Sequence, residues 1–301
     1  MNDCFWHDND RHAYYLRPCE DGDADHVKGQ LRAHDDAYAP PVSGVADERL
    51  VYVATDEDGM LVGGCGVTID CWGVMAIDDL WVDKRHRKKG LGTALVRRAE
   101  RDAQAKGCYL SLVGTFDFQA PNLYEKLGYE LFNIWDDYPA GHANFSLAKR
   151  LRRGKTAGTH EEAPPPYAIA SGEEEHGEYI ADKVADFNHS RVPYLHAYQG
   201  LDKKVVSSDG AVIAGYCVGN SGWDVAILDM IWVDEAYRHA GLGTALLADA
   251  EREVKERGAY LVLSSAFDWQ VGFFLSHGYT VTGELHDCPK GHVYYSLQKR
   301  L

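Results

Sequence analysis

The strongest constraint on the fold of this chain is an internal repeat, because its second half restates its first. The stretch Gly90–Leu95 recurs as Gly241–Leu246, and Trp81–Asp83 recurs as Trp232–Asp234, in each case 151 positions later. Chance does not hold one register over such unusual residues. A repeat of about 150 residues has the size of a domain, so we expect a duplicated domain and not a solenoid of small units.

The two copies differ in length by one residue, and a linker joins them. Near the end of each copy the shift falls to 150, as Tyr129 and Tyr279 show, so the second copy lacks one residue. The segment 152–166 is charged, contains several small residues and ends in prolines, as linkers do. We therefore predict an N-terminal domain at 1–151, a linker at 152–166 and a C-terminal domain at 167–301.

Composition and charge narrow the classes of protein to which this chain can belong. Hydrophobic residues make up 45% of its 301 residues, which is enough for a packed core. The formal net charge of −15 argues against partners such as nucleic acid or an anionic membrane. No run of 18 apolar residues occurs, so we expect no membrane span. The acidic balance is compatible with a cationic substrate such as an amine.

The seven cysteines indicate a reducing compartment. They are scattered along the chain, and none forms a Cys-x-x-Cys pair. We therefore expect free thiols, no metal site and a cytoplasmic protein. The polar start of the sequence lacks the apolar core of a signal peptide, which agrees with that expectation.

Hydrophobic periodicity and turn residues predict an α/β fold with a mixed sheet in each copy. Alternating apolar residues indicate strands, and the spacing of Leu91, Leu95 and Ala99 indicates a helix. The order β-α-β-β-β-α-β-α-β-β combines an antiparallel meander with a β-α-β crossover, which is an α+β arrangement. For the first copy we predict strands at 14–17, 50–54, 61–69, 74–82, 109–113, 130–135 and 144–148, and helices at 24–37, 90–106 and 120–127.

The segment with the most chemical information lies between the fourth strand and the next helix. It reads WVDKRHRKKGLGTALVRRAE and concentrates basic residues within an acidic protein. Glycines let a ligand approach the backbone closely, and the first turn of a helix offers unpaired N–H groups and the positive end of its dipole. These features predict a polyphosphate site, with a solvated basic loop as the alternative.

Two common phosphate-binding motifs do not fit this loop. A P-loop needs Gly-Lys-Ser/Thr, but Gly92 is followed by Thr-Ala, and the dinucleotide fingerprint needs a glycine where Leu95 stands. The segments 87–92 and 238–243 instead resemble the Gln/Arg-x-x-Gly-x-Gly/Ala loop of the GNAT N-acetyltransferase superfamily. With the preceding strand, the order of elements, the later Gly-Tyr pair and the repeat, the resemblance covers both copies nearly whole.

The resemblance implies acetyl-CoA as cosubstrate and direct transfer of its acetyl group to an amine. Backbone amides of the loop would hold the pyrophosphate, and the fourth strand would pair with the pantetheine arm. The fourth and fifth strands would splay apart to leave a slot for the acetyl group. The residues implied are Leu80, Val82, Arg87, Lys88, Lys89, Gly90, Leu91, Gly92, Thr93 and Asn122 in the first copy, and Val233, Arg238, Gly241, Gly243 and Thr244 in the second.

The chemistry needs a proton donor for the departing thiolate and a base for the amine. The resemblance implies a tyrosine as donor, and Tyr124 stands at its position, whereas the second copy has Phe274 there. For the base we propose Asp78, because an apolar strand raises a carboxyl pKa. The structural alternatives are a core tyrosine for Tyr124 and a carboxylate that caps a bulge for Asp78.

The leading hypothesis is an N-acetyltransferase of small-molecule or peptide amines, with the first copy catalytic and the second degenerate. The alternative is a non-catalytic or half-catalytic scaffold or sensor that binds acyl-CoA, and a third hypothesis makes both copies active on the two ends of one substrate. We expect the two domains to pair within the chain and leave homodimer formation open. The acceptor depends on segments 23–46 and 174–200, where the copies diverge.

Overall fold

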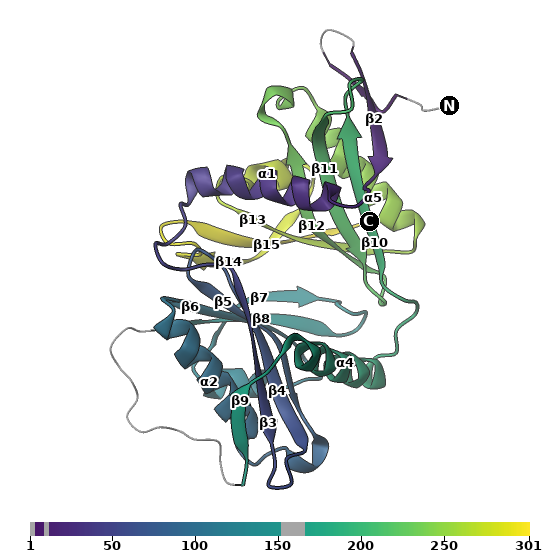
Figure 1. The fold of residues 1–301 in the computed structure, drawn as a ribbon. Helices are drawn as coiled ribbons and strands as arrows, with labels where there is room; N and C mark the ends of the chain where they lie inside the picture. The colour runs from purple at the N-terminus through teal and green to yellow at the C-terminus, as the bar shows by residue number, and fades with distance from the viewer. Residues whose placement is uncertain (1–3, 9–11, 152–165) are drawn as a thin grey trace.

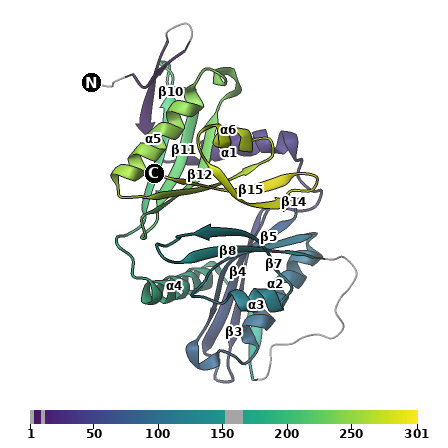
Figure 2. The same cartoon turned by 180° about the vertical axis from the view of Figure 1, so that it is seen from behind.

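The two halves of the chain have the same order of elements (Figures 1 and 2) in the computed structural model, which describes residues 4–8, 12–151 and 166–301. The predicted strands at 61–69 and 74–82 are observed as β4 (Leu61–Ile69) and β5 (Val74–Val82). The predicted mixed-sheet α/β fold is confirmed. The other elements of the first half are β1 (Trp6–His7), β2 (Ala13–Pro18), α1 (Asp23–Tyr38), β3 (Glu48–Thr55), η1 (Lys84–His86), α2 (Leu91–Ala105), β6 (Leu110–Phe116), α3 (Pro121–Lys126), β7 (Glu130–Asp136) and β8 (Ala143–Arg150).

The second half repeats this series with one element for each of those in the first, apart from β1. Its elements are β9 (Ala168–Ser171), α4 (Glu174–Arg191), β10 (Gln199–Val206), β11 (Val212–Asn220), β12 (Val225–Val233), η2 (Glu235–Tyr237), α5 (Leu242–Glu256), β13 (Leu261–Phe267), α6 (Val271–Ser276), β14 (Thr280–His286) and β15 (Val293–Arg300).

The described strands form one continuous mixed sheet. Its order is β1-β2-β10-β11-β12-β13-β15-β14-β7-β8-β6-β5-β4-β3-β9. The pairs β5–β6 and β12–β13 are parallel, as a β-α-β crossover requires. The halves meet where Asn133 of β7 pairs with Gly283 of β14. A side chain at position 283 would clash with the Phe132 carbonyl group, so this close approach needs glycine.

The first strand and helix of each half pack on the sheet of the other half. Strand β2 pairs with β10, and α1 lies on β11 and β12, where Gly215 accommodates Val27. Reciprocally, β9 pairs with β3, and α4 lies on β3, β4 and β5, where Gly64 accommodates Ile180. Figure 1 shows this exchange directly, with the purple α1 among green and yellow elements and α4 among blue ones.

The exchange groups residues differently from the repeat. Residues 40–192 contain one complete sheet-and-helix unit, from β3 to α4, whereas the other unit joins residues before 40 to those after 192. The bounds 1–151 and 167–301 stay a prediction about the sequence repeats. The units that pack together are instead a continuous segment and a second unit that this segment interrupts.

A pair of tryptophans fixes the points at which the exchanged helices end. Trp72 Nε1 donates to the carbonyl oxygen of Ala39 at 2.5 Å, just after α1. Trp223 Nε1 donates to the carbonyl oxygen of Val192 at 3.0 Å, just after α4. Both indoles are buried, so each chain crossing between the halves is tied to a core residue.

All seven cysteines are free thiols. In the part of the chain that the structure describes, no helix has the length and apolar character needed to cross a membrane. Over the same residues, no three His, Cys, Asp or Glu side chains gather in a way that would hold a metal ion.

Candidate functional site

Each half contains a cleft where two parallel strands separate. Strands β5 and β6 pair only as far as Ile77 and Val113, and β12 and β13 only as far as Leu228 and Ser264. Beyond these points β6 stays paired only with its other neighbour, β8, and β13 only with β15. The backbone of 78–82, and likewise of 229–233, therefore faces the cleft on one side without a neighbouring strand. The predicted splay of the fourth and fifth strands is present in both halves.

A β-bulge lies at the point of separation. In β4 and β5 the partners step from Gly66–Asp79 to Val67–Ile77, so Asp78 is the extra residue. In β11 and β12 the same step makes Asp229 the extra residue. A bulge changes the direction of the side chains next to it. Asp78 and Asp229, which align in the repeat, therefore occupy equivalent positions in the two halves.

The glycine loop has one conformation in both halves. Lys88 and His239 adopt left-handed φ values of 60° and 63°, and Gly90 and Gly241 follow with 86° and 87°. The first helical bond of α2 runs from Ala94 N to the Gly90 carbonyl oxygen at 3.0 Å. The preceding amides of each helix have no backbone partner among the described residues, so both loops present the N–H groups of an anion site.

The structure brings the predicted strand residues next to the loop. A Cβ atom on Gly92 would lie 3.9 Å from the side chains of both Leu80 and Val82. On Gly243 it would lie 3.7 Å from Val233. Around the loops, Lys88, Lys89 and Thr244 are exposed. Leu91 is buried, Thr93 is half-buried, and Asn122 is exposed on α3.

The loop arginines also bind the end of their own strand. Arg87 Nε donates to the carbonyl oxygen of Val82 at 2.8 Å, and its guanidinium lies 5.2 Å from the ring centre of Phe187 on α4. Arg238 Nε donates to Val233 at 2.8 Å, and its Nη1 lies 3.4 Å from Nδ1 of His34 on α1. Each loop is thus braced against the helix that the other repeat supplies.

Tyr124 is buried on α3, where Asp79 is one of the groups that affect its pKa. It is 6% exposed on α3, and burial raises its pKa, with smaller contributions from Cys65 and Asp79. Asp78 instead accepts a hydrogen bond from Thr68 Oγ1 at 2.6 Å. Desolvation raises the pKa of both aspartates. The roles of Tyr124 and Asp78 stay predictions.

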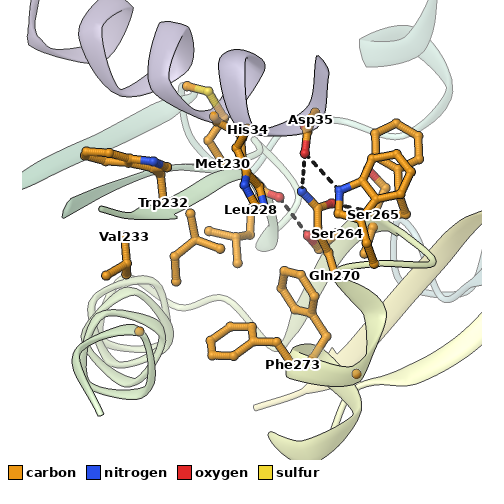
Figure 3. A pocket seen from close by; sticks show the side chains of 18 of the residues that line it. His34, Asp35, Leu228, Met230, Trp232, Val233, Ser264, Ser265, Gln270 and Phe273 are labelled. Atoms are coloured by element: carbon orange, nitrogen blue, oxygen red, sulfur yellow. Dashed lines mark hydrogen bonds between the residues drawn. The ribbon is translucent and has the colours of Figure 1, made fainter. Parts of the chain in front are cut away.

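The second half contains a cavity of about 740 Å³ in its cleft. Figure 3 shows its walls: Asp35 and His34 project from α1, Met230 and Trp232 line β12, and Phe273 closes the side formed by α6. Its lining also includes the loop residues Val233, Arg238, Gly241, Gly243 and Thr244, all of which were predicted to bind the cosubstrate. The cleft of the second copy, which was predicted to be degenerate, therefore has room for a ligand.

Asp35 is the most unusual side chain of this cavity, and it lies in segment 23–46, on which the acceptor was predicted to depend. Its residue is 7% exposed, and its Oδ1 accepts hydrogen bonds from Trp269 Nε1 at 3.0 Å and from Gln270 Nε2 at 2.7 Å. Burial raises the pKa of Asp35 to about 6. Asp35 belongs to the first repeat, whereas the strands and the loop around this cavity belong to the second. The sequence of the second repeat alone therefore does not indicate this residue.

Residues 9–129 and 161–279 each match the family model described as "Acetyltransferase (GNAT) family". Fold and clefts thus define an acyltransferase-type protein with two copies of the domain. The chain belongs to the GNAT acetyltransferase family as a tandem duplication, which confirms the resemblance.

Relatives with described activities cover parts of the chain. A blasticidin-S acetyltransferase of Streptomyces morookaense is 42% identical over 99 residues, which are 33% of this chain and 72% of that protein. Among solved structures, an acetyltransferase from Bacillus cereus ATCC 14579 shares 33% identity over 43% of this chain and 94% of its own, with a TM-score of 0.41. An aminoglycoside 6'-N-acetyltransferase complexed with coenzyme A shares 18% identity over 46% of this chain and 97% of its own, with a TM-score of 0.33.

Proposed function

We propose that this protein is an acetyl-CoA-dependent N-acetyltransferase that moves an acetyl group directly to an amine of a small molecule or peptide. Family membership supports the reaction class. The observation that carries the proposal is the unpaired edge of β5 and of β12, each next to a glycine loop of anion-binding geometry. The seven free thiols agree with work in the reducing cytoplasm.

The clefts offer what acetyl-CoA needs along its whole length. Amides from Lys88 to Thr93 would bind the pyrophosphate, the free edge of β5 at Leu80 and Val82 would pair with the pantetheine amides, and Asn122 would lie near that arm. The equivalent parts of the second cleft are Val233, Arg238, Gly241, Gly243 and Thr244. Bound acetyl-CoA supplies an activated acetyl thioester.

We expect the full chain to bind two equivalents of acetyl-CoA, since both loops have the same backbone conformation. Isothermal titration calorimetry measures this number directly. Acetyl-CoA-dependent thiol release with a panel of amines then tests transfer, and the relative's name makes blasticidin S the first acceptor to try. A chain that binds no acetyl-CoA would contradict the proposal.

In the first cleft, the proposed chemistry divides between a base and a proton donor. The amine nitrogen attacks the thioester carbonyl carbon, the carbon–sulfur bond breaks, and the amine proton passes to the base. Asp78 is the proposed base, and a raised pKa suits a carboxylate for that work. Tyr124, whose pKa is also raised, would donate a proton to the departing thiolate.

Tyr124→Phe should lower kcat by about a hundredfold, the lower end of what a positioned proton donor contributes, and should leave acetyl-CoA affinity unchanged. The variant copies Phe274, which is equally buried at the equivalent position of the second half, so the fold should tolerate it. Steady-state kinetics with one acceptor provide the measurement. An unchanged kcat would remove Tyr124 from the mechanism.

A half-catalytic protein is the second candidate function, and Phe274 is the observation that favours it. The ring has no hydroxyl, although the cavity beside it is lined by the predicted cosubstrate-binding residues. In this version the second cleft binds acyl-CoA without the proton donor of the first. Two equivalents of bound acetyl-CoA, with turnover abolished by Tyr124→Phe alone, would favour it.

A further inference from the structure

We propose that the cleft of the second half binds a cationic amine with an apolar or aromatic body, and that Asp35 is the residue that binds its ammonium group. This deepens the proposed function, on which it rests, by naming the acceptor class of one cleft. The acceptor-binding carboxylate comes from α1, and hence from the opposite repeat to the strands and loop around it.

The carboxylate of Asp35 has an oxygen available for a ligand. Its Oδ1 takes both hydrogen bonds from Trp269 and Gln270, and these two donors are uncharged. Within the described chain, Oδ2 has no hydrogen-bond partner, and Asp35 lines the cavity. Figure 3 shows the group projecting from α1 with both bonds on one oxygen.

No cation among the described residues forms an ion pair with Asp35, although Arg238 lines the same cavity and donates to the Val233 carbonyl oxygen. Arg32, one turn earlier on α1, is committed elsewhere: its Nε lies 2.9 Å from Asp36, and its guanidinium lies over the Trp72 ring at 4.4 Å. Two other carboxylates line the cavity: Asp229 has Asp202 as its charged neighbour, and Asp268 lies 3.2 Å from His292 Nδ1. Among the described residues, neither Asp35 nor Asp229 forms an ion pair. A buried carboxylate without a partner is costly, and a bound cation would offset that cost.

The walls around Asp35 are aromatic and apolar. Trp269, Phe273 and Tyr294 line the cavity together with Leu228 and Met230. Aromatic faces bind apolar ligand surface and attract a nearby cation through their quadrupole. This combination fits a single ammonium group on an apolar body better than a polyamine, which would need carboxylates along the whole cavity.

The first cleft provides an internal comparison with opposite chemistry. Asn188 of α4 stands where Asp35 stands, and its Oδ1 accepts from Gln119 Nε2 at 2.7 Å, as Asp35 accepts from Gln270. Arg49 lies beside the bulge carboxylates there and opposes the rise in their pKa. The first cleft thus has a neutral amide and a nearby guanidinium, so selective binding of a cation is assigned to the second.

The test is calorimetric titration of the full chain, saturated with CoA, with 2-phenylethylamine as the probe. The neutral isostere 2-phenylethanol is the ligand control. Asp35→Asn should weaken amine binding by at least about tenfold, because it removes the charge and keeps the acceptor oxygen that Asn188 uses. Asp25→Asn is the matched control, since Asp25 is an exposed aspartate on the same helix that does not line the cavity, and it should leave the affinity unchanged.

The possible outcomes separate this inference from the proposed function. Equal binding of the amine and the alcohol, or equal amine binding by the Asp35→Asn variant, would overturn the role of Asp35. A chain that binds CoA but not the amine would overturn the inference and leave the proposed function intact. Amine binding that depends on Asp35, without acetylation of any amine, would support the inference and contradict the proposed function. The comparison with the alcohol uses the unaltered protein, so it stands even if the variant does not fold.

Discussion

A fragment of residues 40–192 should unfold cooperatively, whereas a fragment of residues 1–151 should not. The two fragments are nearly equal in length, and both lose the contact between β7 and β14. Only the first contains β9 and α4, which cover its own sheet. In the second, the pocket above Gly64 loses Ile180, which is 0% exposed in the full chain, and α1 has no sheet to cover.

The expected difference between these fragments is large. Burial of each aliphatic side chain contributes about 2 kcal/mol, so loss of a whole covering helix costs on the order of 5 kcal/mol or more. That is comparable to the total stability of a domain. Thermal unfolding followed by circular dichroism measures the outcome. Cooperative unfolding of 1–151 with none for 40–192 would mean that each repeat keeps its own first helix.

Asp35→Asn should raise the stability of the protein at pH 8 by about 3 kcal/mol and should have little effect near pH 4. The pKa of Asp35 is about 6 in the folded protein against an ordinary 3.8, chiefly because of burial. The folded state therefore holds this proton more tightly than the unfolded state does. Stability from this group is present below pH 4 and is lost as the pH rises through 6. An asparagine does not titrate and avoids that loss.

Urea unfolding of both proteins across this pH range tests the prediction. The charged neighbours of Asp35 are Arg32 and Asp36 on its own helix, and Asp229 is the carboxylate that faces the cavity from β12. They are the same in both proteins, so their titration cancels in the difference. A constant difference at all pH values would contradict a raised pKa. A variant that is more stable but binds amine poorly would show that the carboxylate is kept for binding.

Local elements of the fold were predictable because their signals are local. The bounds of β4 and β5 follow from alternating apolar residues between turns, and α2 from its four-residue spacing and the glycines on both sides. The left-handed backbone at Gly90 and Gly241 was not predicted, although glycine is the residue that this conformation favours. Each of these depends on residues that are near one another in the sequence.

The exchange of the first helices was not predictable for a physical reason. Both α1 and α4 present one β-branched apolar side chain, Val27 or Ile180, to a sheet glycine, Gly215 or Gly64, so this pattern alone does not say which helix covers which sheet. The choice depends on how the two halves lie in space, which no local pattern reports. For the same reason the sequence did not bring Asp35 to Gln270, or Asn188 to Gln119.

The exchange has a consequence for how such a protein can diverge. Each cleft is built from both repeats, so in the proposed function its acceptor side is encoded in one repeat and its cosubstrate side in the other. We therefore expect a substitution on the cavity-facing side of α1 to alter the selectivity of the C-terminal cleft and to leave the N-terminal one unchanged. Recombination that replaced one repeat as a block would give both clefts a new combination of acceptor wall and cosubstrate loop. The two clefts can diverge by point changes, but neither is complete without both repeats.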